Sequence, residues 1–311
     1  MRTSRSTRGK RSVREAAVPV RTPYRLDLTA VVLRRLSTNV VDTFDGSAYR
    51  RLVGDPAAPA LFTAEQHAPD ALIVQLDGPA AERFDPEMLA RRLLGTDADL
   101  RAFYRGAKTI PWLHELARGA RGVKPPRYPS LWETACNAII YQQISIHAAG
   151  AILRRVIERY TRPLERDGVR LYPFPSITTL LDAPPTDLRA LGLSVNKINA
   201  LTAVGDAIAS NDLDEAALER LPTPRLLDEL VAHKGIGPWT AAVIALRGFG
   251  RLDVFPMKDS GATALLRKLS GDDGIEAEPI LAALSPQQGM LYYHLLLGRL
   301  NATGEVSLTS P

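Results

Sequence analysis

Two glycines enclose one aliphatic residue at Gly235-Ile236-Gly237, where an apolar helical segment ends and Pro238 suits the first turn of another helix. Glycine permits left-handed backbone and leaves its amide open to close approach. These amides and the N-terminus of the second helix predict an anion site suited to a phosphate group. We expect Ile236 to fill the core between the two helices. Taken alone, the same residues also fit a plain tight turn.

Two carboxylates follow this hairpin. Asp259 lies just before a helical stretch, where the positive end of the helix dipole favours a charged carboxylate. Aspartate is also a common N-cap, and without its flanking residues the capping interpretation is favoured. We interpret the second acid, Asp253, as a residue that orders the loop.

The residue types that hold metals or form disulfides are sparse. Cys136 is the single cysteine of the 311 residues, which excludes an internal disulfide framework and a four-cysteine cluster. The five histidines are scattered and show no metal-ligand spacing. We therefore expect no metal held by side chains.

The formal net charge of +5 is concentrated at one end. Residues 1–25 hold eight basic residues and one acid, whereas the rest of the chain holds 31 basic and 33 acidic residues. Residues 1–22 are predicted to be a basic disordered tail, attracted to a polyanion or serving only for solubility. A specific binding site must come from the near-neutral body.

The length is sufficient for two domains with buried cores. No apolar run approaches the roughly 18 residues of a membrane span, and the N-terminus shows no apolar signal region. We expect a cytoplasmic protein.

The first third of the chain has mixed α and β character. Residues 24–29 alternate apolar and polar side chains, and residues 71–76 form an apolar run, so both are predicted strands. A helix is predicted between the N-cap Asp85, followed by Pro86, and the terminating Gly95. Residues 23–110 are the predicted α+β domain.

Residues 111–311 are predicted to be a helical domain. Ser130 and Glu133 form a predicted capping box, in which each side chain bonds the other residue's amide. Ser194 is the predicted cap of a helix with apolar residues at helical spacing.

The block from Lys234 to Asp259, with GIGPWTA, ALRG and DVFP in order, resembles the helix-hairpin-helix (HhH-GPD) DNA glycosylase superfamily. It is most similar to the 3-methyladenine DNA glycosylase II (AlkA) branch. The residues 138–149 and 192–197 also resemble that branch, and the similarity extends over roughly residues 24–300. The resemblance implies a mostly α fold: a helix-hairpin-helix glycosylase domain with an N-terminal α+β domain.

The resemblance also implies the chemistry. Such enzymes flip a damaged nucleotide into a pocket, where an ionised carboxylate stabilises an oxocarbenium-like sugar. Asp259 matches that carboxylate. Bifunctional members carry a Schiff-base lysine where this chain has Trp239, so no lyase activity is expected.

The remaining site residues are also implied by resemblance. Trp239 is expected to wall the base pocket, with a core tryptophan as the alternative. Tyr141, Val243 and Gln287 are the other expected pocket residues, the last two replacing aromatic residues of the family. Gln143 is the expected wedge that fills the gap left by the flipped base, although Gln142-Gln143 also fits a polar helix end. The expected phosphate contacts are Gly235, Ile236, Gly237 and Thr240.

The sequence therefore favours a monofunctional glycosylase that removes alkylated purines from duplex DNA. The alternatives are a non-catalytic module that binds damaged DNA and a glycosylase for oxidised or deaminated bases. The expected partner is double-stranded DNA with damaged bases, and the expected state is a monomer. No cofactor is expected, apart from a monovalent cation at the hairpin when DNA is bound.

Overall fold

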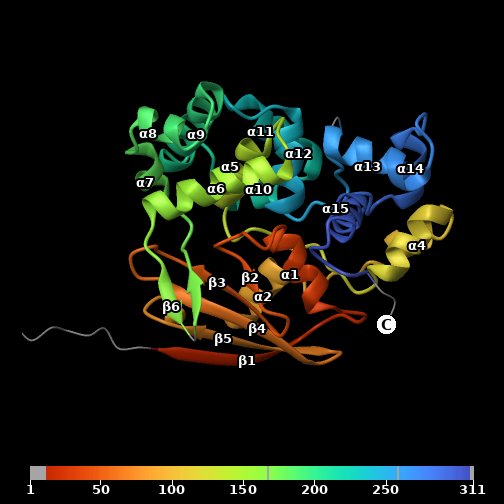
Figure 1. The fold of residues 1–311 in the computed structure, drawn as a ribbon, viewed down its shortest axis with the longest axis horizontal. Coiled ribbons are helices and arrows are strands. Elements are labelled where there is room, and N and C mark those ends of the chain that lie inside the picture. Colours follow the sequence, from red (N-terminus) through yellow and green to blue (C-terminus); the bar gives the residue numbers. More distant parts are fainter. Residues whose placement is uncertain (1–11, 167, 258, 309–311) are drawn as a thin grey trace, which may run out of the picture.

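The computed structural model describes residues 12–166, 168–257 and 259–308. An antiparallel sheet forms one side of the molecule, and most of the helices form the other (Figure 1). The order of the strands is β1-β5-β4-β3-β2. The strands are β1 (Val13–Pro19), β2 (Thr43–Phe44), β3 (Ala48–Val53), β4 (Ala60–Ala68) and β5 (Ala71–Asp77).

The predicted strand at residues 71–76 is confirmed as β5. Leu72, Val74 and Leu76 alternate onto one face of the sheet and are fully buried there. Helices α1 (Leu26–Arg34) and α2 (Pro86–Leu94) cover this face. The short 3-10 turn η1 (Ala81–Arg83) precedes α2. Helix α2 begins and ends as predicted, with the Asp85 carboxylate accepting the Met88 amide and Gly95 in the left-handed conformation.

The predicted disordered tail is wrong for residues 12–22. The segment Val13–Pro19 is strand β1, which pairs antiparallel with β5 along its whole length. The basic composition hid the strand, whose inward positions are the small apolar residues Ala16 and Val18. Residues 1–11, with most of the predicted tail's charge, lie outside the described residues. The sheet domain therefore starts near residue 13.

The strand predicted at residues 24–29 is also wrong, because α1 begins at Leu26. This helix lies between two apolar cores: Leu26, Ala30 and Leu33 pack toward the sheet, whereas Leu28 and Val32 pack toward the C-terminal helices. A helix buried on both sides lacks a polar stripe, so a short alternating window at its start resembles a strand.

The helical part consists of the remaining elements, including a small β-hairpin. These are α3 (Arg101–Ala107), α4 (Pro111–Gly119), α5 (Leu131–Tyr141), α6 (Ile146–Tyr160), α7 (Ile177–Leu181), α8 (Pro185–Ala190), α9 (Val195–Ala209), α10 (Glu215–Arg220), α11 (Thr223–Ala232), α12 (Pro238–Arg247), α13 (Ser260–Ser270), α14 (Ala277–Leu284) and α15 (Met290–Ala302), with the hairpin strands β6 (Leu164–Arg166) and β7 (Val169–Leu171).

The predicted boundary at residue 110 needs correction, because α3 packs with the C-terminal helices. A side chain at Gly106 of α3 would lie 2.1 Å from the Ala283 carbonyl oxygen of α14. Phe103 of α3 and Leu113 of α4 are both buried in the core that α13 to α15 share. The helical domain thus begins near residue 100.

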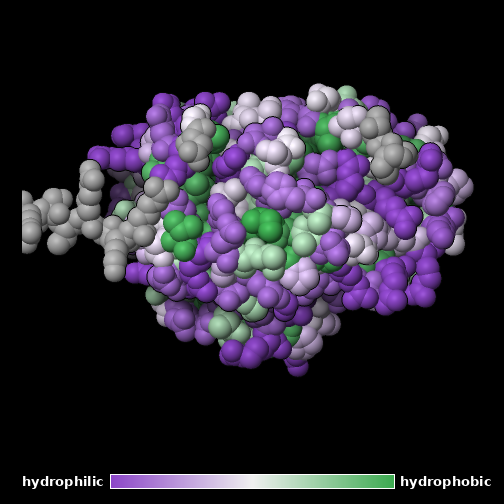
Figure 2. Space-filling view, turned by 90° about the horizontal axis from the view of Figure 1, so that it is seen from below, coloured by the Kyte–Doolittle hydropathy of each residue, from purple (hydrophilic) through white to green (hydrophobic). Residues whose placement is uncertain are grey.

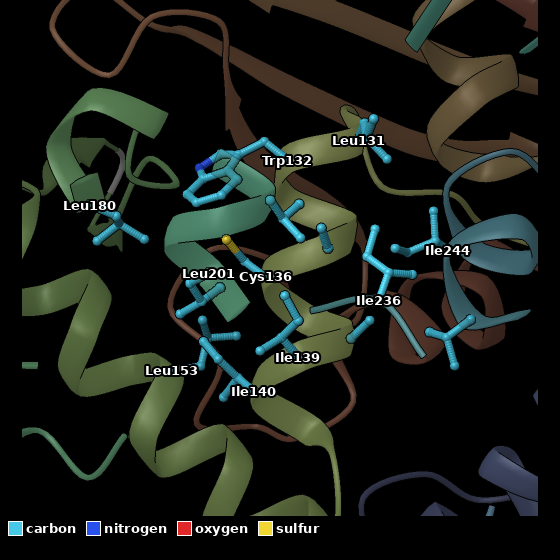
Figure 3. Close-up of a cluster of buried hydrophobic side chains, with 14 of the residues drawn as sticks. Leu131, Trp132, Cys136, Ile139, Ile140, Leu153, Leu180, Leu201, Ile236 and Ile244 are labelled. Atoms are coloured by element: carbon cyan, nitrogen blue, oxygen red, sulfur yellow. The ribbon is translucent and has the colours of Figure 1, made fainter. Parts of the chain in front are cut away.

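Helix α5 is the centre of the larger helical core (Figure 3). Its Trp132, Cys136 and Ile139 lie toward Leu201 of α9, and Ile236 of the hairpin packs from the other side. Ten consecutive residues of α5 are buried. The core thereby fixes the end of α5, from which the loop at residues 142–145 departs.

The predicted capping box at the start of α5 forms only in part. The Ser130 hydroxyl accepts the Glu133 amide at 3.2 Å, as predicted. The Glu133 carboxylate does not return to the Ser130 amide but bonds the guanidinium of Arg51 on β3. A long-range buried ion pair replaces the local bond.

The face of the molecule seen from below is mostly hydrophilic, with isolated hydrophobic side chains (Figure 2). Within the described residues, no helix combines the length and the apolar character that a bilayer crossing requires.

Buried His294 gives the fold a pH dependence. This residue of α15 is fully buried, its Nδ1 lies 2.8 Å from the Met290 carbonyl, and its Nε2 has no partner among the described residues. Burial lowers the pKa of His294 to about 4. Between pH 6.5 and 4 the unfolded chain binds a proton that the folded chain does not bind, so the free energy of unfolding falls as the pH falls through this window.

We expect the protonation of this histidine to lower the free energy of unfolding by about 3 kcal/mol between pH 6.5 and 4. The variant His294→Leu should flatten the pH dependence in urea unfolding measured from about pH 4 to 7, whereas His147→Gln at an exposed site should leave it unchanged. An unaltered slope in His294→Leu would assign the pH dependence to other groups.

Candidate active site

A cavity of about 670 Å³ lies where five segments meet. Its walls come from the end of α1, the end of α5 with the following loop, the first turns of α12 and α13, and one face of α15. Seven predicted site residues line it: Tyr141, Gln143, Gly237, Trp239, Thr240, Val243 and Asp259. The structure thus brings residues from distant parts of the sequence to one cavity.

Asp259 is held by two donors. Its Oδ1 accepts the Ala262 amide at 2.8 Å, so the predicted N-cap of α13 is confirmed. Its Oδ2 accepts the indole Nε1 of Trp239 at 3.1 Å. The two hydrogen bonds fix the direction of the carboxylate at the cavity wall.

Trp239 contacts both the helical core and the cavity. The half-buried ring packs against the larger helical core and also lines the cavity. Its hydrogen bond to Asp259 joins the second hairpin helix to α13. The ring is therefore a rigid wall of the cavity next to the carboxylate.

The loop between α5 and α6 is held from two sides. Lys197 of α9 donates from Nζ to the Ile140 carbonyl at 2.7 Å, which satisfies the C-terminal end of α5. Gln142 donates from Nε2 to the Thr240 hydroxyl of α12 at 2.5 Å. Gln143 follows these anchors directly and has a φ of 57° and an exposed side chain at the cavity rim. Its positive φ turns the chain sharply there.

Thr240 was expected among the phosphate contacts of the hairpin, and its side chain is not placed for that role. The residue is 1% exposed, and its hydroxyl accepts the bond from Gln142 inside the cavity. Thr240 is the third residue of α12, and it faces inward because the helix packs that side against α5.

The two hairpin glycines differ in their backbone conformation and in their surroundings. Gly235 has a φ of 94°, and a Cβ there would lie 2.9 Å from the Cα of Ala200. Gly237 has an ordinary φ and is exposed, and a Cβ added to it would meet no atom within 4 Å. Ile236 is buried as predicted. The amides of Gly237 and Trp239, at the first turn of α12, have no partner among the described residues.

Gln287 does not belong to the cavity, so that prediction is wrong. Its Oε1 accepts the Phe103 amide at 2.9 Å, and its Nε2 donates to the Asp99 carbonyl. These bonds satisfy the start of α3. Asp253 is a loop residue, as predicted, since its carboxylate accepts the Thr223 hydroxyl.

Sequence reasoning missed several cavity residues, among them Arg35, Tyr292 and Arg299. Arg35 comes from the end of α1, and the other two come from α15. No local motif marks them, because only the packing of α15 against α1 and α13 brings them to Asp259.

The chain belongs to the HhH-GPD superfamily. Residues 136–286 match the family model described as HhH-GPD superfamily base excision DNA repair protein. This region contains the hairpin, Trp239 and Asp259.

Named relatives fall in the AlkA-like branch. The chain is 32% identical over 257 residues to a probable bifunctional transcriptional activator/DNA repair enzyme AlkA of Mycobacterium tuberculosis, covering 81% of this chain and 50% of the relative. It is 29% identical over 165 residues to a DNA-3-methyladenine glycosylase of Bacillus subtilis, covering 53% of this chain and 54% of the relative. The chain thus spans about half the length of these relatives.

Solved structures share the fold. A 3-methyladenine DNA-glycosylase from Archaeoglobus fulgidus superposes with a TM-score of 0.75 at 22% identity, covering 92% of this chain and 98% of that one. An 8-oxoguanine glycosylase/lyase from Clostridium acetobutylicum in complex with double-stranded DNA gives a TM-score of 0.70 at 15% identity, covering 95% and 99%. The mostly helical fold with an N-terminal sheet is confirmed.

Proposed function

We propose that the chain is a monofunctional DNA glycosylase that hydrolyses the N-glycosidic bond of alkylated purines in duplex DNA. The observation that carries the proposal is the Asp259 carboxylate, fixed by Trp239 and the start of α13 at the wall of a cavity of about 670 Å³. The names of the relatives from Mycobacterium tuberculosis and Bacillus subtilis support the substrate class.

The reaction needs little beyond an oriented carboxylate. The bond from C1′ to the base nitrogen breaks, and its electron pair neutralises the cationic alkylated base. The positive charge that develops on the sugar is stabilised by ionised Asp259. A water oxygen then bonds C1′, and its proton passes to Asp259 or to solvent. The products are an abasic site and a free base.

The cavity residues support hydrolysis without lyase chemistry. No lysine is among the described residues that line the cavity, and Trp239 has no amine to form a Schiff base with the sugar. Gln143 at the rim is the proposed wedge, since its exposed side chain can enter the gap left by the flipped nucleotide.

The hairpin supplies the proposed phosphate contact. The open amides of Gly237 and Trp239 at the start of α12 suit one DNA phosphate, with a monovalent cation as an optional bridge to the hairpin carbonyls. The proposal includes a monomer that acts on damaged duplex DNA and needs no cofactor. With such a substrate, we expect the chain at the nucleoid in the cytoplasm.

The direct test is base release from a methylated duplex. We expect free 3-methyladenine and 7-methylguanine by mass spectrometry, with strand breaks only after alkali treatment. Binding of the duplex without release of any base would instead indicate a damage-binding module. Breaks that form without alkali would contradict the monofunctional assignment.

The two hairpin glycines offer a matched pair of variants. Gly237→Ala should leave the free energy of unfolding within about 0.5 kcal/mol, because its Cβ meets open space. It should weaken duplex binding about tenfold, because the methyl group blocks the phosphate and one charge-assisted bond is lost. Gly235→Ala should destabilise the fold by more than about 1 kcal/mol, since its positive φ and its contact with Ala200 both oppose a side chain.

Fluorescence anisotropy with a duplex and urea unfolding separate these effects. If Gly237→Ala bound the duplex as tightly as the wild type, the hairpin would not be part of the DNA interface.

A further inference from the structure

Lys197 of α9 occupies a position that is unfavourable for a cation. It is the third residue of the helix, where the positive end of the helix dipole opposes a positive charge. The residue is half-buried, burial lowers the pKa of Lys197, and it forms no ion pair among the described residues. Its location therefore points to a contact outside α9.

That contact is with the C-terminal end of α5. The Lys197 Nζ donates to the Ile140 carbonyl at 2.7 Å. This carbonyl belongs to the last turn of α5, where a helix leaves its carbonyls without a backbone donor. Ile140 is 1% exposed, so loss of the ammonium would leave a buried acceptor unpaired.

The segment just before α9 packs on the helix that follows the loop, α6. Arg155 of α6 donates from Nε to the Leu191 carbonyl at 2.9 Å. Gly192 has a φ of 107°, and a Cβ there would lie 3.1 Å from Cγ1 of Ile152 on α6. The start of α9 and the residues before it thus contact the helix on each side of the loop that carries Gln143.

The loop that carries Gln143 needs such support. It joins α5 to α6 in four residues, and Gln143 has a φ of 57°, which is uncommon for a residue with a side chain. The second anchor of the loop is the bond from Gln142 to the Thr240 hydroxyl. Because Gln143 is exposed, packing around its side chain does not fix its direction, which depends on these two anchors.

We propose that Lys197 is a positioning residue for nucleotide flipping, because it holds the end of α5 so that Gln143 stands at the cavity rim before DNA binds. A wedge enters the base stack only if the loop behind it resists the displaced bases. A loop that is ordered during folding also needs no further ordering on the duplex, which lowers the free-energy cost of binding. This inference rests on the proposed glycosylase function, with Gln143 as the wedge, and adds a residue that acts through the wedge and not on the reacting bond.

The test compares two duplexes that carry 7-methylguanine, one with cytosine opposite the lesion and one with a tetrahydrofuran abasic analogue opposite it. The first has a base pair to break and an orphaned base to hold, whereas the second has neither. We expect Lys197→Met to lower single-turnover release about tenfold on the paired duplex, which is the loss expected from one hydrogen bond with a charged donor. Release from the duplex with the analogue should change less than about threefold, because little work is left there for the wedge.

Three further variants sharpen the comparison. Lys197→Arg keeps a charged donor at the end of α5 and should stay within about threefold of the wild type on both duplexes. Lys197→Gln, whose shorter side chain carries no charge, gives the same comparison if Lys197→Met does not fold. Arg189→Met is the matched control: it removes an exposed cation of α8 that forms no ion pair among the described residues, and it should match the wild type.

The outcomes separate this role of Lys197 from the proposed function. An equal loss on both duplexes in Lys197→Met, or no loss on the paired duplex, overturns the positioning role and leaves the proposed function intact. A fall of about one in the slope of log K against log salt would assign Lys197 to a phosphate contact and would also overturn the role. If Lys197→Arg lost as much activity as Lys197→Met, the bond to Ile140 would not be the cause. Release of 7-methylguanine from neither duplex by the wild type overturns the proposed function.

Discussion

Asp259→Asn is expected to lower the single-turnover release of methylpurines about 10²–10³-fold while the protein still binds the duplex. The carboxylate is the single negative charge among the described cavity residues, so its loss removes the stabilisation of the developing sugar cation. Asparagine caps a helix about as well as aspartate, so α13 should begin as before.

The substitution has one structural cost. Asp259 accepts from both Ala262 and Trp239, through different oxygens. An asparagine that keeps its oxygen on the Ala262 amide turns its NH2 group toward the indole N–H, and two donors then face each other. We expect a loss of about 1 kcal/mol in the free energy of unfolding, which is far too small to unfold the site.

Asp253→Asn is the matched control. It removes a carboxylate from the same loop, where the side chain contacts Thr223 outside the cavity. Its release rate should stay within a factor of about three of the wild type. If Asp259→Asn released methylpurines at the wild-type rate, the carboxylate would be only a helix cap and the proposed mechanism would fail.

The hairpin and Asp259 could be predicted because their signals are local. A positive φ at Gly235, a buried Ile236 and a proline at the start of α12 follow from turn and helix chemistry within a few residues. The cap at Asp259 depends on the adjacent helix alone. Local rules therefore predict the hairpin turn and the helix cap without any knowledge of the rest of the fold.

The direction of side chains could not be predicted in the same way. Resemblance assigns Thr240 and Gln287 to a site by position, but packing decides where each side chain points. Thr240 faces the Gln142 amide, and Gln287 bonds the backbone of α3, a helix that the sequence pattern had placed in another domain. Such partners lie far apart in the chain, beyond the reach of any local rule.

Arg35 illustrates the same limit most clearly. Nothing in the sequence separates it from Arg34, and α1 itself was predicted to begin as a strand. Its position in the cavity depends on a strained turn and on the contact of α1 with α15. Only the assembled fold identifies it as a site residue.

Arg51→Met is expected to lower the free energy of unfolding by about 3–5 kcal/mol. Arg51 is fully buried on β3, where Nη1 lies 2.9 Å from Asp42 and Nη2 lies 2.7 Å from Glu133 of α5. The hydroxyl of Tyr49 also donates to Asp42, at 2.6 Å. Removing the guanidinium leaves two buried carboxylates without a cation. The sheet then loses its charged link to the helix that carries the Gln143 loop.

The loss should depend on pH with a definite sign. Burial raises the pKa of Glu133 even with Arg51 present, and removal of the arginine must raise that pKa further. A carboxyl whose folded pKa lies above its unfolded value stabilises the fold as the pH falls, because the folded state then binds the proton first. The deficit of Arg51→Met relative to the wild type should therefore be largest near about pH 7 and should shrink toward about pH 5 in urea unfolding.

Arg50→Met is the matched control for Arg51→Met, and a double variant tests for recovery of stability. Arg50 is adjacent on β3 and pairs with the partly exposed Asp45, so its loss should cost at most about 1 kcal/mol. Adding Glu133→Gln to Arg51→Met removes one of the stranded charges and should recover part of the stability at about pH 7. A deficit that did not change with pH would show that the loss of Arg51 does not raise the pKa of Glu133. A deficit below about 1 kcal/mol would show that the network does not join the two domains energetically.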